Sequence, residues 1–319
     1  MTEQPVSAKT KELPFKHNKI PISHGTEGYK QFLEKFPGFT VCPYIADKDA
    51  EGWDKSTSRV YMNQVLPNFI YLPVNISKND TSALRDILQL ASENAQVAAI
   101  NITQPHKSSP TLRQFFFGDE NSDENIDTLI RNTEGKLEPY DLNAPSFVSW
   151  FNDEAGSFRD KTVFLVGVGG VGEPMAKAIV KEFPKSLILI DPVDKNDLAE
   201  KLSAQTQVTY LENIGQVDVR NIGDSLIVIN AAGKEGATDA AGLDQILNSN
   251  INENNIFVDI RPQLKIEIVE AAKKQGWQAY TGYGMNSRND YILLCGIAEY
   301  MGVEPIPFTE FQAFVAQAS

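Results

Sequence analysis

Cysteine and histidine are scarce in this chain. Its 319 residues include 2 cysteines, Cys42 and Cys295, and 3 histidines. Two cysteines cannot build a disulfide framework, and together with so few histidines they do not supply a convincing zinc site. We therefore expect no bound metal, and a reducing cytoplasm is the expected compartment.

The chain also lacks long hydrophobic runs and an excess of basic residues. No stretch approaches the roughly 18 consecutive apolar residues of a transmembrane helix, and residues 1–19 lack the apolar core of a secretory signal. Lysine and arginine total 29 against 42 aspartates and glutamates, which gives a net charge of −13. Because such a surface repels nucleic acid and anionic membranes, we expect neither as a partner. A local cluster of donors can still bind a small anion.

The length suits two domains of about 150 residues each. Residues 1–25 are polar and interrupted by prolines, which predicts a flexible tail. Beyond them, short apolar segments typical of buried strands alternate with helical patterns. The expected strands are 39–45, 68–75, 97–101, 163–166, 187–190, 226–229 and 256–259, and the expected helices are 81–94, 144–155, 171–183, 291–301 and 308–318. This alternation predicts an α/β protein built from βαβ units, with helices on both faces of a parallel sheet.

A glycine-rich segment follows the strand expected at 163–166. Gly167, Gly169 and Gly172 form the pattern G-x-G-x-x-G at the start of a helix. There the first glycine permits a tight turn, the second lets a pyrophosphate approach, and the third lets the helix pack on the strand. Asp191 follows about 20 residues later, where an acid binds the ribose diol and repels the extra phosphate of NADP. The pattern predicts NAD as the cofactor. The alternatives are a glycine-rich turn without nucleotide, and an Asp191 that only caps the next turn.

A second unusual segment runs from Asn101 to Lys107, with the sequence Asn-Ile-Thr-Gln-Pro-His-Lys. Asn101 ends a buried strand, Thr103 can cap the following turn, and Pro105 is tolerated in a first helical turn. This arrangement places Lys107 at the edge of the sheet, where ligands of open α/β sheets bind. A lysine with a lowered pKa can relay a proton there. The alternative is a solvated surface lysine.

From about residue 53 to 301, these motifs resemble the shikimate dehydrogenase family, which includes quinate dehydrogenases. The family motif N-V-T-x-P-x-K is matched by Asn101 to Lys107, and its nucleotide loop by Gly167 to Val171. Five shorter matches complete the resemblance: Ser56-Thr-Ser58 to S-x-S, Met62-Asn63 to H-N, Asn132-Thr133 to the end of A-V-N-T, Asn230-Ala-Ala232 to N-A-T, and Gly282-Tyr-Gly-Met285 to G-x-G-M.

The resemblance implies a substrate-binding α/β domain over 26–150, a Rossmann NAD(P)-binding domain over 151–285, and C-terminal helices over 286–319 that return to the first domain. It implies hydride transfer between a nicotinamide cofactor and a hydroxylated cyclic carboxylic acid, as in aromatic amino acid biosynthesis, and it is compatible with a homodimer. Lys107 would accept the hydroxyl proton. The other implied substrate contacts are Ser56 and Ser58 to the carboxylate, and Asn101, Thr103 and Asn132 to the ring hydroxyls. The implied cofactor residues are Gly167, Gly169, Gly170, Val171, Gly172, Asp191, Asn230, Ala231, Gly282 and Met285.

Three positions depart from the family pattern. Asn143 stands where the family has a catalytic aspartate, and Asp141 lies two residues before it. Asn289 replaces a glutamine that contacts substrate, and Arg59 replaces the proline after S-x-S. Two hypotheses therefore stay open: an NAD-dependent oxidoreductase, and a ligand-binding relative that is non-catalytic or has another substrate. A third is a different two-domain Rossmann enzyme with an amino-acid or pterin substrate.

Overall fold

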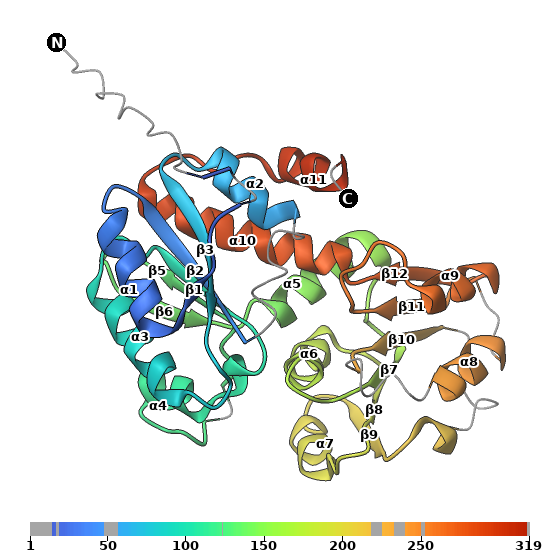
Figure 1. Cartoon of the computed structure of the whole chain (residues 1–319). Helices are drawn as coiled ribbons and strands as arrows, with labels where there is room; N and C mark the ends of the chain where they lie inside the picture. The colour runs from blue at the N-terminus through green and yellow to red at the C-terminus, as the bar shows by residue number, and fades with distance from the viewer. Residues whose placement is uncertain are drawn as a thin grey trace. The chain divides into compact units, whose positions relative to one another are not determined.

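The computed structural model describes residues 15–16, 19–47, 57–122, 124–217, 225–232, 240–249 and 253–317. The chain divides into two compact units (Figure 1). The first unit comprises residues 1–141 and 290–319, and the second comprises residues 142–289. The helix at the end of the chain thus belongs to the unit in which the chain begins.

The first unit is built on a mixed sheet of six strands in the described residues. In spatial order they are β1 (Ser23–His24), β3 (Phe69–Asn75), β2 (Thr40–Ala46), β4 (Ala99–Ile102), β5 (Thr128–Arg131) and β6 (Leu137–Tyr140). The pairings among β1 to β4 are parallel, as the βαβ pattern predicts, but β5 and β6 are antiparallel to their neighbours. A short turn joins β5 to β6, and a parallel pairing would need a crossover of about a dozen residues. The end of the predicted tail is also ordered, since it forms β1.

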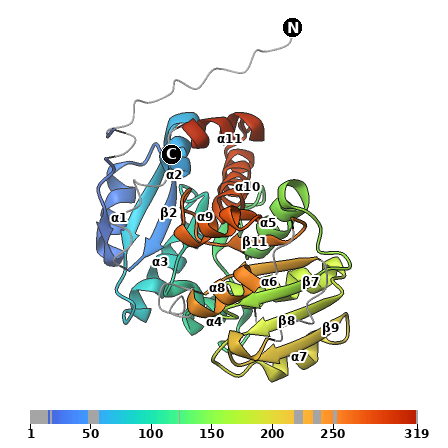
Figure 2. The same ribbon diagram turned by 90° about the vertical axis from the view of Figure 1, so that its right-hand side faces the viewer.

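Helices cover both faces of this sheet (Figure 2). The helices of the first unit are α1 (Gly25–Lys35), α2 (Thr57–Val65), α3 (Thr81–Glu93), the 3-10 helix η2 (His106–Ser108), α4 (Pro110–Phe117), α11 (Phe308–Gln317) and, from Asp290 onward, α10 (Tyr283–Met301). Helix α3 begins where Asp80 caps the Ala83 N–H at 2.9 Å. Helix α10 approaches the sheet closely at Gly296, because a Cβ there would lie 2.7 Å from Ile130 Cγ2.

The second unit contains a fully parallel, doubly wound sheet. Its order is β12 (Gln278–Thr281), β11 (Ile256–Asp259), β10 (Leu226–Asn230), β7 (Thr162–Val166), β8 (Ser186–Ile190) and β9 (Gln207–Leu211). The chain runs outward from β7 to β9 and then returns to β10 on the other side of β7. The order of the strands therefore reverses between β7 and β10, at the point where such sheets bind ligands.

Two apolar layers enclose that sheet. One contains α5 (Asn143–Trp150), α6 (Gly172–Ile179) and α7 (Asn196–Leu202), and the other contains α8 (Ala240–Ser249) and α9 (Glu267–Lys274) (Figure 1). Side chains of β7 alternate between them, since Val163 and Leu165 face the first layer and Phe164 the second. Burial on both faces explains the continuous apolar runs in the sequence.

The helix expected at 144–155 begins at Asn143 and continues as a π-helix, η3 (Phe151–Ala155). Its aromatic residues pack in the core of the second unit, where the rings of Phe151 and Phe158 stack 4.0 Å apart. A Cβ at Gly284 would lie 2.0 Å from Nε1 of Trp150, so glycine is required for this close approach. None of the helices in the described ranges is long and apolar enough to span a bilayer.

Candidate functional site

Lys107 lies in the turn that follows β4. The end of β4 is hydrogen-bonded to segments on both of its sides. The Ile102 N–H donates to Asp127 O, just before β5, at 2.7 Å, and the Thr103 N–H donates to Ile45 O on β2 at 3.0 Å. The chain then turns, and the Lys107 N–H donates back to Thr103 O at 3.1 Å. The backbone thus holds the half-buried Lys107 just beyond the carboxyl end of β4, as the sequence motif predicts.

The charges of two carboxylates that flank the β5–β6 hairpin, Asp127 and Asp141, influence the pKa of Lys107. Burial lowers the pKa of the lysine below its ordinary value, while the charges of Asp127 and Asp141 partly oppose that shift. The Asp127 N–H donates to Tyr140 O at 3.0 Å, so Asp127 sits next to the hairpin end that carries Asp141. Asp127 is only 5% exposed. The sequence interpretation missed it, although a charged residue within an apolar run is a signal that could have found it.

Asn143 and Asn289 contact each other in the second unit. Asn289 Nδ2 donates to Asn143 Oδ1 at 3.1 Å, and Asn289 is buried. The pairing orients both amides, so each presents a dipole and neither presents a charge.

The other polar residues that the sequence analysis assigned to the substrate, Asn101, Thr103 and Asn132, each make a hydrogen bond within the protein. Asn101 Oδ1 accepts from the Tyr71 hydroxyl at 3.0 Å. The Thr103 hydroxyl donates to Ile45 O at 3.2 Å. Asn132 lies in the β5–β6 turn, where Nδ2 donates to Glu138 Oε1 at 2.9 Å. The turn thus engages the Asn132 side chain, and its assigned substrate contact stays a prediction.

The serine pair is only partly described. Ser56 lies outside the described residues. Ser58 lies in the first turn of α2 and is buried. Its hydroxyl donates to the buried carboxylate of Asp290 on α10. That donor is therefore engaged within the protein.

The glycine loop has the geometry that its pattern predicts. Gly167 has φ of +85°, and a Cβ there would lie 2.5 Å from Ala232 N. A Cβ at Gly172 would lie 1.9 Å from Gly167 O, whereas one at Gly169 would meet no atom within 4 Å. Gly167 and Gly172 are thus required by the fold, while Gly169 opens the loop on the side where a pyrophosphate would approach. Gly170 is exposed and Val171 precedes α6, so their backbone lies at the same helix N-terminus.

Asp191 connects this loop to the end of β8. One carboxylate oxygen accepts from the Val168 N–H at 2.6 Å, and the other accepts from the Val193 N–H at 2.8 Å. The cap on the following turn is therefore present, and a contact to the loop accompanies it. Each carboxylate oxygen has a second lone pair, so these bonds leave acceptor capacity for a ribose hydroxyl.

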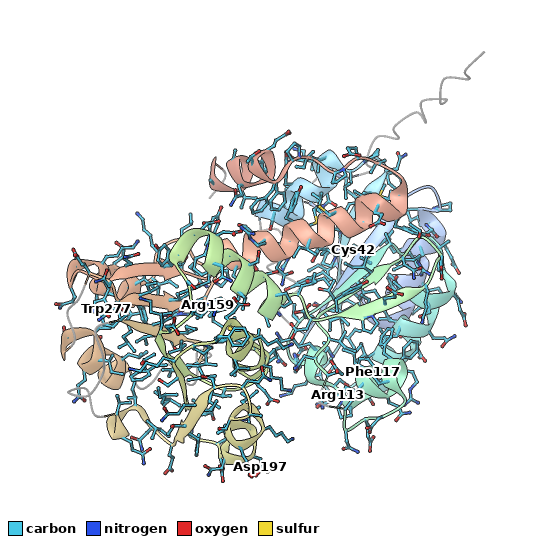
Figure 3. The ribbon with its side chains drawn as sticks, turned by 180° about the vertical axis from the view of Figure 1, so that it is seen from behind. Cys42, Arg113, Phe117, Arg159, Asp197 and Trp277 are labelled. Atoms are coloured by element: carbon cyan, nitrogen blue, oxygen red, sulfur yellow. The ribbon has the colours of Figure 1, made fainter. Side chains whose placement is uncertain are left out.

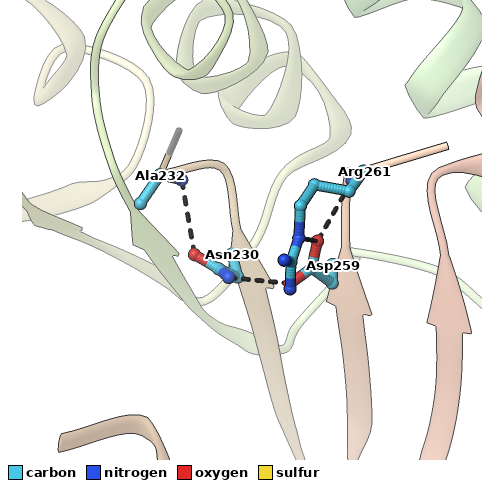
Figure 4. Close-up of polar contacts among 4 residues, drawn as sticks. All are labelled: Asn230, Ala232, Asp259 and Arg261. Carbon is cyan, nitrogen blue, oxygen red and sulfur yellow. Dashed lines mark hydrogen bonds and ion pairs between the residues drawn. The ribbon is translucent and has the colours of Figure 1, made fainter. Parts of the chain in front are cut away.

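A buried polar network lies at the ends of β10 and β11 (Figure 4). Asn230 Nδ2 donates to Asp259 Oδ2 at 2.8 Å, and Asn230 Oδ1 accepts from the Ala232 N–H at 3.3 Å. Arg261 forms a two-pronged ion pair with Asp259, with both N···O distances at 2.8 Å. The sequence interpretation found Asn230 but missed Asp259 and Arg261, although an acid that ends an apolar strand is a recognisable signal. The network fixes the loop that carries Ala231.

The last predicted cofactor residues lie near the start of α10. A Cβ at Gly282 would lie 1.9 Å from Ile260 O, so only glycine fits. Met285 is 6% exposed and packs in the core of the second unit. Among the described residues, no group of three or more His, Cys, Asp or Glu side chains could hold a metal ion.

Comparisons with known proteins give consistent relatives. No family model matches the chain. The shikimate dehydrogenase (NADP(+)) of Alkaliphilus oremlandii is 22% identical over 232 residues, which cover 68% of this chain and 77% of that protein. The shikimate dehydrogenase (NADP(+)) of Lysinibacillus sphaericus is 27% identical over 222 residues, covering 67% and 76%.

Among solved structures, shikimate 5-dehydrogenase from Listeria monocytogenes, in complex with shikimate and NAD, superposes with a TM-score of 0.66 at 15% identity. The match covers 87% of this chain and 96% of that one. This similarity of fold agrees with the two α/β units of the chain, of which the second has the doubly wound Rossmann arrangement. The chain is thus similar in sequence to shikimate dehydrogenases over about two thirds of its length, and it shares their fold.

Proposed function

We propose that this protein is an oxidoreductase of the shikimate/quinate dehydrogenase type, which transfers a hydride between a nicotinamide cofactor and a hydroxylated cyclic carboxylic acid. The observation that carries the proposal is Lys107, a half-buried lysine with a lowered pKa beside two carboxylates. A lysine with a lowered pKa is better able to accept a proton from a hydroxyl group. We further propose a cytoplasmic location and a homodimer.

Three residues of the first unit, Lys107, Asp127 and Asp141, would have separate roles in this reaction. Lys107 Nζ would accept the proton of the substrate hydroxyl as the C–H hydride leaves. Asp127 and Asp141 would stabilise the ammonium ion that forms, because an opposite charge favours the charged form of a lysine. They would thereby supply the negative charge that Asn143 lacks. The nicotinamide ring, when bound, supplies the hydride acceptor.

The cofactor would be held by the second unit. The backbone at Gly169 to Gly172 would bind the pyrophosphate at the N-terminus of α6, where N–H groups are free of helix partners. Asp191 would accept from the ribose diol. We propose NAD as the cofactor, because the charge of Asp191 opposes an additional phosphate on that ribose.

The non-catalytic alternative rests on Asn143, which cannot carry a charge. It is weakened by Asp127 and Asp141, whose carboxylates act on Lys107 from the adjacent hairpin. Lysines with shifted pKa values beside charged partners are concentrated at catalytic sites.

Direct assay tests the proposal. Purified protein is incubated with shikimate, quinate and related cyclic acids and with NAD or NADP, and nicotinamide reduction is followed by absorbance. We expect reduction of NAD with at least one acid, and tighter binding of NAD than of NADP by titration calorimetry. Binding of both ligands without any reduction would support the non-catalytic alternative, and tighter binding of NADP would remove the role assigned to Asp191.

A further inference from the structure

A cluster of polar side chains lies on the face of the first sheet that α2 and α10 cover. It consists of Ser58 and Arg59 on α2, Tyr44 on β2, Tyr71 on β3 and Asp290 on α10, and we call it the Arg59 cluster. Ser58 and Asp290, which share a hydrogen bond, are 3% and 4% exposed. Figure 3 shows the same sheet face at Cys42, beneath α10.

Arg59 is the cation of this cluster. Its guanidinium lies 4.1 Å from the centroid of the Tyr44 ring and 5.8 Å from that of Tyr71. Burial by itself lowers the pKa of Arg59, but Tyr71, Tyr44 and Asp290 more than offset that effect, so the pKa is raised and the side chain stays charged. Its Nε is shielded from solvent and has no hydrogen-bond partner among the described residues. A buried donor without a partner is costly, and an incoming acceptor would relieve that cost.

The cluster is connected to the strand that leads to Lys107. The Tyr71 hydroxyl donates to Asn101 Oδ1 at 3.0 Å, and Asn101 Nδ2 donates to Thr128 Oγ1 at 3.4 Å. Tyr44 pairs with Asn101 in the register of β2 and β4. A hydrogen bond therefore joins the Arg59 cluster to β4, the strand that the Lys107 turn follows.

We infer that Arg59, and not Ser58, binds the carboxylate of the substrate. The inference rests on the proposed function, because it requires an acidic substrate. Ser58 donates its single hydroxyl proton to Asp290, so that proton is already engaged within the protein. A guanidinium presents several N–H donors in one plane, which matches a carboxylate, and the Tyr44 ring restricts the orientation of that plane. Arg59 thereby selects a charged acid over a neutral polyol of the same shape.

Binding measurements with a charged and a neutral ligand test this inference. Titration calorimetry is performed with shikimate and with its methyl ester, on the wild type, Arg59→Gln, Arg59→Lys and Arg85→Gln. Arg85 is an exposed arginine on α3, so its substitution removes the same charge away from the cluster. Circular dichroism and thermal unfolding establish that each variant is folded.

We expect the wild type to bind shikimate about 10- to 100-fold more tightly than the ester, in line with the strength of charged hydrogen bonds. Arg59→Gln is expected to remove this preference, Arg59→Lys to keep part of it, and Arg85→Gln to leave it unchanged. Equal shikimate affinity in the wild type and Arg59→Gln would overturn the inference and leave the proposed function intact. Preference of the wild type for the ester would overturn it as well. If the wild type bound neither shikimate nor any related acid, the proposed function itself would fail.

Discussion

In the proposed reaction Lys107 accepts a proton, so it must first be unprotonated, and burial shifts its pKa in the direction that favours the neutral amine. Lys107→Ala removes the acceptor without touching the glycine loop. We predict that turnover falls by about 10²- to 10⁴-fold, the usual contribution of general acid–base catalysis, while the NAD dissociation constant stays within about twofold. Steady-state kinetics and calorimetry measure the two quantities.

The matched control is Lys136→Ala, which removes an exposed lysine from the β5–β6 turn. It is expected to keep wild-type turnover. Wild-type turnover in Lys107→Ala itself would show that this lysine does not relay the proton.

The charge of Asp141 contributes to the pKa of Lys107. Its carboxylate raises the pKa of Lys107 against the effect of burial, so Asp141→Asn should lower that pKa further. In the proposed reaction oxidation requires the neutral amine of Lys107, so its rate should rise as the pH rises through the pKa of that lysine. We therefore predict that the rising limb of the pH profile of kcat/KM moves to lower pH in Asp141→Asn.

Glu134→Gln is the control for that shift, since Glu134 is an exposed acid in the same hairpin. Its profile should match the wild type. A limb that moves to higher pH in Asp141→Asn, or does not move, would mean that Asp141 is not the charge that balances Lys107. Asn143→Asp is then the substitution to examine, because it restores an acid at the position where the family has one.

At the scale of elements, the β7–α6 connection shows why three glycines of one motif are not equivalent. A Cβ at Gly172 would lie 1.9 Å from a backbone oxygen, whereas a Cβ at Gly169 would meet nothing. We predict that Gly172→Ala lowers the melting temperature and abolishes NAD binding, because the loop and helix must move apart. Gly169→Ala should weaken NAD binding and leave the melting temperature close to that of the wild type.

Thermal unfolding together with calorimetry separates these two effects. A Gly172→Ala protein as stable as the wild type would show that the loop relaxes at little cost. Wild-type NAD affinity in Gly169→Ala would mean that the open side of the loop is not where the pyrophosphate lies.

At the scale of the whole molecule, the proposed ligands belong to different units. The proposed acid contacts Arg59 and Lys107 lie in the first unit, and the glycine loop lies in the second. A ligand that binds only the native state raises its stability, by about 2.7 kcal/mol at 100 times its dissociation constant. We predict that Gly172→Ala loses the thermal shift caused by NAD and keeps the shift caused by shikimate. Arg59→Gln should show the reverse pattern, and loss of both shifts in either variant would contradict separate sites.

The sequence by itself determined the elements whose causes are local. Apolar runs predicted β2, β3, β4, β7, β8, β10 and β11, because strands buried on both faces must be apolar along their whole length. The glycine loop was recognisable because tight turns and close packing exclude side chains at Gly167 and Gly172, whatever the rest of the chain does. The sequence analysis did not predict the antiparallel hairpin β5–β6, the strand β1, or the edge strands β9 and β12. The pairing of short strands depends on neighbours that are distant in sequence, and the two edge strands of the second sheet are too exposed to form apolar runs.

Only the tertiary structure decided what surrounds the reactive groups. Ser58 and Asp290 are separated by 232 positions in sequence, and Asn143 and Asn289 by 146, yet each pair shares a hydrogen bond. The lowered pKa of Lys107 is likewise a property of its surroundings, because burial by many residues and the charges of Asp127 and Asp141 set it together. Spacing along the chain identifies a lysine or a serine, but folding determines which charges lie beside it.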